Sequence, residues 1–548
     1  MPPMSAGSLS TARGCVPRFR PVATLSPPLA SLPTLTPDRP VESRDPATGE
    51  VWRSYATPSG LDVVQAVQRA RAAQPAWAAR GVQARADILR RFKAGLFARR
   101  LEVARVISRE NGKPVGEALL SEVMVTLDYA GYYIGLAPRR LAPRVEKSRT
   151  AATALKQVTI EYHPHGVVGV IAPWNYPFQL AAGALIPALV AGNAVVLKPS
   201  EFTPACGVLL VELLHAAGVP ADVVQVIPGD GSAGAALVQA GVNRVHFTGS
   251  VATGRKVAAA CGALLIPCGL ELGGSDAAIV CADANLARAA RGLAWGRFSN
   301  AGQTCVAPKR IFVEQPAFDA FAALFAAEVK ALTVGGATVV GVEVGPMIRP
   351  DAVTILEGQF ADAIAGGATV VARAPAPAGA EGFFPPTVIT NVTPAMRVMR
   401  EETFGPLVPL ISVANDDEAI AMANASDFGL SGSVWTSDAA RGRRLASRLE
   451  AGTVAVNDAV LTAGMSNVPH GGVKTSGLGR SHGEAGLMEC VESRAVVTDR
   501  VAAARQPWWF RYGREHEANA DALVTVLHAP SIGARLAVLG RVLRSLLG

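Results

Sequence analysis

Between residues 195 and 274 the sequence alternates short strand-like segments with segments of helical periodicity. The strand-like segments are rich in Val, Ile and Leu: VVLK, VVQVIPGDG, RVHFTGS and LLIPCGLELGG, at residues 195–198, 223–231, 244–250 and 264–274. Strands separated by helices pair in parallel, because each helix returns the chain to the same end of the sheet. The sequence therefore predicts an α/β fold with a doubly wound parallel sheet.

The stretch FQLAAGALIPALVAGNAVVL, residues 178–197, is the only one apolar enough to resemble a membrane span. It contains Gln179 and Pro187, and Gly192-Asn193 is a helix-stop signal before a β-branched run. We therefore expect a helix, a tight turn and a buried strand here.

At 548 residues the chain is too long for one hydrophobic core, so two or three domains are expected.

The net positive charge of the chain lies mostly at its two ends. Residues 1–40 and 501–548 each carry a net charge of +3, which leaves only +2 of the total of +8 between them. The body of the chain has no nucleic-acid signature, and no nucleic-acid partner is expected. The Pro-rich, acid-poor residues 1–40 are predicted to be a disordered extension, with a transit peptide as the alternative.

The seven cysteines are scattered, with no CxxC pair and no His/Cys cluster at metal-ligand spacing. This distribution predicts no metal site and favours a reducing compartment, the cytoplasm. Cys305 differs from the others, because Gly302, Gln303 and Thr304 precede it and few apolar neighbours could bury its sulfur. It is either a nucleophile or the small buried hydrophobe that most free cysteines are.

Three segments place polar groups at the ends of predicted strands, where open α/β sheets bind ligands. Lys198 and Glu201 follow the first strand. Gly249-Ser250 ends the strand at 244–250 and opens a helix that contains Gly254, an arrangement that binds phosphate or serves only as a helix cap. Glu271 lies in the apolar strand at 264–274. Burial there would raise its pKa and suit a general base, unless a salt bridge neutralises it.

Seven segments are the basis of a family resemblance: PWNYPF (173–178), LKPSEFTP (197–204), FTGS (247–250), LELGG (270–274), NAGQTC (300–305), EETFGP (401–406) and PHGGVKTSGLGR (469–480). In order and spacing they resemble the aldehyde dehydrogenase superfamily, from about residue 42 to residue 500. The resemblance implies an oxidoreductase that converts an aldehyde to a carboxylic acid with NAD, or with NADP as the alternative.

Carried over residue by residue, the resemblance also implies roles. Cys305 would be the nucleophile, Glu271 the general base that hydrolyses the thioester, and Asn175 the side-chain donor to the oxyanion. The cofactor would contact Lys198 and Glu201 at the adenosine ribose and Ser250 at the pyrophosphate. The remaining expected cofactor contacts are Glu402 and Phe404 at the nicotinamide riboside, together with Trp174, Ser200, Gly231, Gly249, Gly254 and Leu272.

The resemblance implies a division of the chain as well. A cofactor-binding domain with the doubly wound sheet is expected at residues 41–145 and 166–270, and an α/β catalytic domain at 271–485. Small β oligomerisation strands are expected at 146–165 and 486–500, within a homodimer or homotetramer.

The chain departs from the family pattern at two positions, with His470 in place of the usual Phe and Ser275 where Lys or Asn is frequent. GRSHGEAGL (479–487) and the long tail resemble a subgroup, including plant family 22, that oxidises bulky, lipophilic or carotenoid-derived aldehydes. Succinate-semialdehyde dehydrogenases are the alternative, but they hold the distal carboxylate with two arginines. Matching the motifs puts Ser299 and Gly183 at those positions.

Other classes fit the sequence less well. A coenzyme A-acylating enzyme would not need Glu271, and a papain-like hydrolase would need a histidine in a comparable motif. A non-catalytic member would have lost Cys305, Glu271 or Asn175, and all three are present.

Residues 531–548 form a cationic apolar segment beyond the resemblance. Its apolar residues recur at helical spacing, and its only charges are three arginines: Ile532, Leu536, Leu539, Leu543 and Leu546, with Arg535, Arg541 and Arg544. Such a helix is a poor membrane span. It is expected either to lie in a membrane interface, with Trp508 and Trp509 at headgroup level, or to pack on the catalytic domain or a partner subunit.

Overall fold

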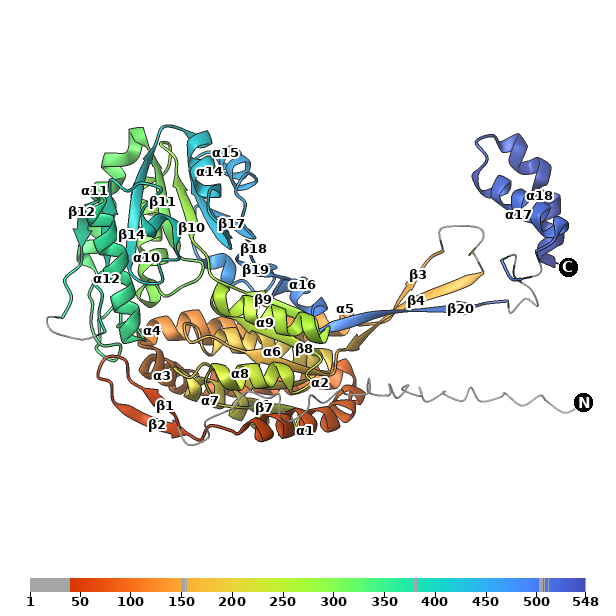
Figure 1. Ribbon diagram of the computed structural model, residues 1–548, viewed down its shortest axis with the longest axis horizontal. Helices are drawn as coiled ribbons and strands as arrows, with labels where there is room; N and C mark the ends of the chain where they lie inside the picture. The colour runs from red at the N-terminus through yellow and green to blue at the C-terminus, as the bar shows by residue number, and fades with distance from the viewer. Residues whose placement is uncertain are drawn as a thin grey trace, which may run out of the picture. The chain divides into compact units, whose positions relative to one another are not determined.

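The computed structural model describes residues 40–148, 153, 155–377, 382–501, 506, 508–510 and 512–547. Apart from Pro40, the predicted N-terminal extension lies outside the described residues. The chain divides into two compact units, Met1–Pro138 with Pro164–Cys490, and Arg139–His163 with Val491–Gly548. Figure 1 shows their elements.

The first unit contains a six-stranded sheet of order β19-β9-β8-β5-β6-β7. From β5 the chain runs outward through β6 and β7, and then returns to add β8 and β9 on the other side of β5. The pairs from β9 to β7 are parallel, and only β19 is antiparallel. The predicted doubly wound parallel sheet is confirmed. Its strands are β5 (Val167–Ile171), β6 (Ala194–Lys198), β7 (Val224–Val226), β8 (Arg244–Thr248), β9 (Cys268–Glu271) and β19 (Gly477–Leu478).

Helices from the N-terminal half of the chain cover this sheet. α6 is buried on almost every side and ends at Gly192, whose φ of +104° only glycine adopts readily. β6 begins two residues later, which confirms the predicted helix, turn and strand. The other elements are β1 (Val41–Arg44), β2 (Val51–Tyr55), α1 (Gly60–Ala79), α2 (Gly81–Ala98), α3 (Arg100–Asn111), α4 (Val115–Ala118), the π-helix η2 (Leu119–Met124), α5 (Val125–Arg140), α6 (Gln179–Ala191), α7 (Pro204–Ala216), α8 (Gly231–Gln239) and α9 (Val251–Leu264).

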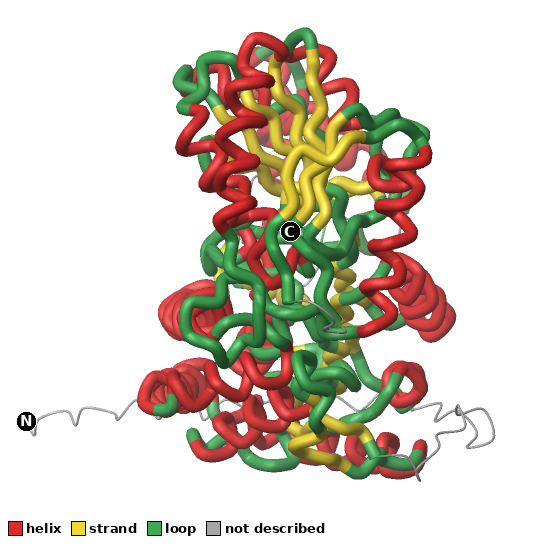
Figure 2. Tube along the Cα trace, turned by 90° about the vertical axis from the view of Figure 1, so that its left-hand side faces the viewer, coloured by secondary structure: helices red, strands yellow, loops and turns green. Residues whose placement is uncertain are grey.

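A seven-stranded sheet of order β12-β13-β14-β11-β10-β16-β17 forms the rest of the first unit. All pairs are parallel except β12–β13. β10, β11 and β16 are fully buried, as expected for parallel strands covered on both faces. Figure 2 shows these strands between helices. The strands are β10 (Asp276–Val280), β11 (Pro308–Glu314), β12 (Thr369–Arg373), β13 (Thr387–Thr390), β14 (Leu407–Val413), β16 (Ser431–Trp435) and β17 (Thr453–Val456).

The core of this part is apolar and aromatic, with Phe321 and Phe325 stacked at 5.6 Å between ring centroids. The remaining elements are α10 (Leu286–Phe298), η4 (Ser299–Gly302), α11 (Gln315–Ala331), α12 (Pro350–Ala365), α13 (Arg397–Arg400), α14 (Asp416–Asn424), β15 (Phe428–Gly429), α15 (Ala439–Ala446), η5 (Leu461–Ala463), β18 (Val473–Lys474) and α16 (Gly483–Met488).

The second unit contains a three-stranded sheet of order β20-β4-β3 and two helices. Arg494 on β20 and Glu161 on β4 form an ion pair at 2.6 Å. β4 and β20 lie within the segments predicted for oligomerisation, 146–165 and 486–500, whereas β3 begins two residues before the first of them. The role in oligomerisation stays a prediction. The elements are β3 (Arg144–Glu146), β4 (Lys156–Pro164), β20 (Val491–Asp499), α17 (Arg514–His528) and α18 (Ile532–Leu547).

The cationic segment forms the helix α18, which packs against α17. Val542 is buried, whereas Ile532, Leu536 and Leu543 are 75%, 63% and 50% exposed. The side chain of Leu546 is not among the parts of the chain that the structure describes. Within the described part of the chain, none of the helices combines the length and hydropathy that a membrane span needs.

Candidate active site

The predicted cofactor residues lie at one edge of the six-stranded sheet. Because β5, β6, β7, β8 and β9 are parallel, the segments that follow them meet at their carboxyl ends. The strand order reverses between β5 and β8, which is where such sheets bind ligands. The residues at this edge are Trp174 and Asn175 after β5, Lys198, Ser200 and Glu201 after β6, Gly231 after β7, Gly249 and Ser250 after β8, and Glu271 and Leu272 at β9.

The start of α9 presents free backbone N–H groups at the carboxyl edge of the sheet. Ser250 is the N-cap, and its Oγ accepts from the backbone N–H of Thr253 at 3.3 Å. No acidic residue lies in the first turn, so the positive end of the helix dipole is uncompensated. Gly254 packs directly against Leu272, and a Cβ on this glycine would lie 2.4 Å from Leu272 Cδ2. The surroundings of Gly231, at the start of α8, are open by contrast.

Lys198 and Glu201 form a polar pair beyond β6. Lys198 is buried, and its Nζ lies 3.3 Å from Glu201 Oε2. Burial lowers the pKa of Lys198, and the charge of Glu201 opposes this effect. Ser200 Oγ donates to the same carboxylate at 3.4 Å. The pair offers a donor and an acceptor to sugar hydroxyls.

Glu402 and Phe404 come from the other sheet, in the loop before β14. Oε1 of Glu402 accepts from Gly274 N–H at 3.0 Å, and a Cβ on Gly273 would lie 2.1 Å from Oε2. The approach of this carboxylate leaves no room for a side chain at Gly273, whereas a Cβ on Gly274 would lie 2.7 Å from the carbonyl oxygen of Cys305. Phe404 makes an edge-to-face contact with Trp174, at 5.4 Å between ring centroids. The loop before β14 thus contacts the segments that follow β5 and β9.

Lys309 is a site residue that the sequence reasoning missed. It is fully buried, and Nζ donates to the carbonyl oxygens of Thr304 and Cys305 at 2.9 and 2.7 Å. Nζ also lies 3.8 Å from Glu402 Oε1, and burial lowers the pKa of Lys309. The signal was a Lys-Arg pair at the start of the apolar strand PKRIFVE, since a buried cation needs partners.

Cys305 follows a strained turn. Asn300 and Ala301 have φ values of +52° and +53°, and a Cβ on Gly302 would lie 2.6 Å from the backbone of Gly405. Positive φ at alanine is costly, so the surrounding structure must hold this turn. The turn leaves the Cys305 side chain half-buried at the wall of a cavity of about 940 Å³.

The Cys305 thiol is protonated at neutral pH in this structure. Burial raises its pKa to about 12, and the charges of Glu402, Asp276 and Glu271 act in the same direction. Lys309 opposes them. Because the thiolate is the nucleophile, its proton must be removed when the thiol reacts.

Asn175 lies against the cysteine loop. Its side-chain Nδ2 donates to the carbonyl oxygen of Gln303 at 3.1 Å. Its own carbonyl oxygen accepts from Asn300 Nδ2 at 2.8 Å and from Lys113 Nζ at 2.9 Å. Lys113 is in turn paired with Glu122 at 2.6 Å, and both side chains are fully buried. This ion pair, also missed from the sequence, anchors the loop after β5, because Glu122 also accepts from the backbone N–H of Phe178. The side-chain amides of Asn175 and Asn300 join that loop to the cysteine loop.

Glu271 is buried at the end of β9, as its place in an apolar strand predicts. Burial raises its pKa to about 7. Hydrogen bonds from Ser481, including Oγ to Oε1 at 2.8 Å, and the charge of Arg480 act in the opposite direction. A carboxyl group with this pKa is half ionised near neutral pH, which suits a general base. The negative charges of Glu271 and Glu402 both raise the pKa of the Cys305 thiol.

The cavity beside Cys305 is lined mainly by apolar and aromatic groups. Ser299 lines it, whereas Gly183 borders a separate, smaller cavity, so neither position supplies an arginine. Arg291, on the exposed surface of α10, is the one arginine or lysine among the described residues that line the cavity. The lining includes Leu120, Met124, Tyr176, Trp295, Phe298, Val306, Val340, Leu461 and His470.

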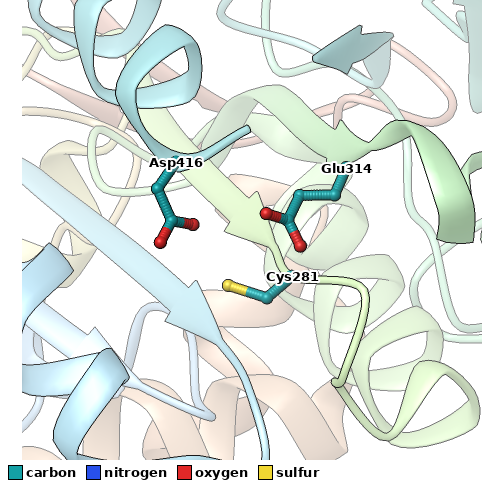
Figure 3. A group of neighbouring side chains, drawn as sticks. All are labelled: Cys281, Glu314 and Asp416. Carbon is teal, nitrogen blue, oxygen red and sulfur yellow. The ribbon is translucent and has the colours of Figure 1, made fainter. Parts of the chain in front are cut away.

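A second cluster, Cys281, Glu314 and Asp416, brings three side chains of metal-ligating type within 4.8 Å of one another (Figure 3). Arg441 already pairs with Glu314 at 2.5 Å and with Asp416 at 2.6 Å. Burial raises the pKa of Cys281 to about 12, which keeps it a thiol. The arginine neutralises the carboxylates, and the cluster is a structural ion-pair network.

Comparisons with known proteins agree with this geometry. The model of the aldehyde dehydrogenase family matches residues 35–496. A Mycolicibacterium smegmatis protein provisionally named as an NADP(+) succinate-semialdehyde dehydrogenase is 39% identical, over 84% of this chain and 89% of its own. The 4,4'-diapolycopene aldehyde oxidase of Methylomonas is 38% identical, over 86% and 88%. A Mycobacterium tuberculosis aldehyde dehydrogenase structure complexed with NAD+ superposes with a TM-score of 0.80 at 32% identity, over 84% of this chain and 95% of that one.

Proposed function

Because the chain belongs to the aldehyde dehydrogenase family, we propose that it oxidises a lipophilic aldehyde to the carboxylic acid with a nicotinamide dinucleotide. The observation that carries this proposal is the position of Cys305. It lies at the wall of a largely apolar cavity and close to two groups of complementary chemistry, the Asn175 amide and the Glu271 carboxyl.

The residues at the sheet edge fit a dinucleotide. Lys198 and Glu201 would hold the adenosine ribose, and the start of α9 at Ser250 would hold the pyrophosphate. Glu402 and Phe404 would hold the nicotinamide riboside. The fit rests on the chemistry of the donor set, with free backbone N–H groups at the start of α9 for phosphate and the carboxylates of Glu201 and Glu402 for ribose hydroxyls. When bound, the nicotinamide ring supplies the hydride acceptor. Relatives named for NADP(+) and a structure with NAD+ support either form.

The protein's own groups perform the remaining chemistry. Cys305 adds to the aldehyde carbonyl, and the oxyanion that forms accepts hydrogen bonds from Asn175 Nδ2 and the Cys305 backbone N–H. After oxidation the acyl group is held as a thioester on the same sulfur. Glu271 takes a proton from water, the hydroxyl adds to the thioester carbon, and the carbon–sulfur bond breaks to release the acid.

The cavity supports a lipophilic substrate over succinic semialdehyde. A carboxylate at the far end of a substrate needs charge-assisted partners, and the two positions expected to supply them are Ser299 and Gly183. Arg291 lies on an exposed helix surface, where a single ion pair contributes little. The relative named for diapolycopene aldehyde supports a long hydrocarbon, and the relative named for succinic semialdehyde supports the alternative.

A panel of aldehydes tests the substrate class. Hexanal, decanal, benzaldehyde and succinic semialdehyde are compared by kcat/KM, with NAD and NADP, from the absorbance of the reduced cofactor. We expect kcat/KM to rise with chain length because each buried methylene contributes about 0.8 kcal/mol. A higher kcat/KM for succinic semialdehyde than for hexanal and benzaldehyde would show that the cavity has been misinterpreted.

We also propose that the three-stranded sheet joins copies of the chain. β20 and β3 are its two edge strands, and unpaired edges template pairing with another chain. Val145 on β3 and Val497 on β20 are 56% and 60% exposed. The solution mass of the full-length protein is the test, because a monomer contradicts this proposal.

For α18 we propose contact with an anionic lipid bilayer. Its exposed apolar side chains form one stripe, and its charges are all positive, which complements an anionic headgroup layer. The aromatic side chains that precede α17 are exposed as well and suit the interface: Trp508, Trp509, Phe510 and Tyr512. Such contact would bring the enzyme to the phase into which a lipophilic aldehyde partitions.

A further inference from the structure

His470 lies between the carboxyl group of Glu271 and the cavity that Cys305 borders. Oε1 of Glu271 accepts from Ser481, but Oε2 is buried without a hydrogen-bond partner among the described residues. Nε2 of His470 lies 3.7 Å from Oε2. His470 lines the cavity that holds Cys305, whereas Glu271 lines only the separate, smaller one. The imidazole therefore borders both the carboxyl group and the substrate cavity.

Backbone pairing fixes this arrangement. His470 and Ser481 form an antiparallel bridge, with N–H to carbonyl distances of 2.7 and 2.8 Å. β19, just before Ser481, pairs with β9 in the register Gly477 to Glu271. The His470 ring also stacks on the ring of His482, at 5.4 Å between centroids. The position of the imidazole is thus set by the same strands that hold Glu271.

His470 is a neutral donor under the conditions where Glu271 is a carboxylate. Burial lowers the pKa of His470 to about 4, and the charge of Arg480 acts in the same direction. His482, whose pKa burial also lowers, is neutral too. Arg480 also acts on Glu271 and lowers its pKa, and Glu271 interacts with Cys305 and Tyr129, both protonated at neutral pH. A neutral imidazole has one N–H, and a carboxylate at Oε2 favours the tautomer that carries it on Nε2.

We propose that His470 is a positioning residue for thioester hydrolysis, because its Nε2–H hydrogen-bonds Oε2 of Glu271 and orients the carboxylate toward the attacking water. The bond forms when the two atoms approach by about half an ångström, or through one bridging water. The inference rests on the proposed role of Glu271 as the base.

An activated ester isolates the hydrolysis step. p-Nitrophenyl hexanoate acylates the Cys305 thiolate with release of p-nitrophenolate, and water then hydrolyses the same kind of thioester without any cofactor. The initial burst reports acylation, and the steady rate reports hydrolysis. The pH dependence of the steady rate is measured for the wild type, His470→Phe and His470→Gln. Gln is the matched control, since its amide keeps an N–H donor at similar reach.

The N–H donor stabilises the carboxylate, so its loss raises the pKa of Glu271. We expect the acidic limb of the His470→Phe profile to move up by about one pH unit, with hydrolysis about tenfold slower below neutral pH and unchanged at high pH. His470→Gln should keep the wild-type profile. An unshifted His470→Phe profile overturns the inference, as does an equal shift in both variants. His470→Leu replaces His470→Phe if the latter does not fold.

Glu271→Gln separates this inference from the proposed function. If Glu271→Gln hydrolyses the acyl enzyme at the wild-type rate, the role of Glu271 as the base is wrong. If Glu271→Gln stops hydrolysis while His470→Phe leaves the profile unshifted, only the role of His470 is wrong.

Discussion

Replacing Glu271 with Gln should stabilise the folded protein, and the gain should depend on pH. Burial raises the pKa of this carboxyl group from about 4.5 to about 7. Above pH 7 the folded state therefore holds a charge that its surroundings disfavour by roughly 3 kcal/mol relative to the unfolded chain. The sign follows from proton binding. Between these two pKa values the folded state binds more protons, so the wild type loses stability as pH rises.

Gln at position 271 has the same shape and cannot ionise. The advantage of Glu271→Gln over the wild type should therefore grow by about 2.5 kcal/mol between about pH 5 and pH 8. Urea unfolding of both proteins across this range measures it, with Glu450→Gln, an exposed carboxylate, as the control. A constant difference between the wild type and Glu271→Gln would refute the burial argument.

The same variant should show a burst of reduced cofactor followed by slow turnover, because only hydrolysis needs the base.

Three further outcomes test the site and the tail. Cys305→Ser should lose aldehyde oxidation but still bind cofactor, and retention of more than about a tenth of the wild-type rate, roughly 1.4 kcal/mol of barrier, contradicts its role. NAD should have a higher kcat/KM than NADP, because the Glu201 carboxylate accepts ribose hydroxyls and repels a 2′-phosphate, and Glu201→Ala should narrow the gap. A higher kcat/KM of the wild type for NADP than for NAD contradicts this role of Glu201. The full-length protein should float with anionic liposomes, whereas the chain truncated after residue 500 and Leu536→Asp should not. Equal flotation of full-length and truncated protein, or flotation of neither, excludes the lipid contact. If the full-length protein does not float but forms an assembly with more copies than the truncated protein, α18 binds a second copy.

The sequence was sufficient to predict the elements that local pattern determines. The turn at Gly192, the strand that ends at Lys198 and the capped helix after Ser250 all follow from residue types within a few positions. Because parallel strands end at one edge, the convergence of their terminal residues followed from the fold class. The pKa shift of Glu271 followed from its apolar strand.

The contacts that join distant segments could not be predicted in the same way. Glu122 pairs with Lys113 and also accepts from the backbone N–H of Phe178, 56 positions away. A single glutamate in a helix is usually solvated, so the sequence gives no reason to bury this one. The positive φ of Ala301 is equally invisible, because the tertiary structure imposes it against the local preference.

Burial keeps Cys305, the proposed nucleophile, as a thiol at neutral pH, and it leaves Glu271, the proposed base, about half ionised. Cys305 and Glu271 have raised pKa values, and each carboxylate near the sulfur makes its ionisation harder. Lys309 is the buried cation that opposes this effect, and it is anchored to the backbone on both sides of the peptide bond between Thr304 and Cys305. The cavity is largely apolar, with Glu117, Glu328, Glu343 and Arg291 as the charged groups among its lining residues, so it suits a hydrocarbon better than an anion. The high pKa of the Cys305 thiol keeps it poorly reactive at rest. Among the groups that act most strongly on the pKa of Cys305, Lys309 is the one that lowers it, so the ionisation of this thiol depends on a cation that the backbone holds in place.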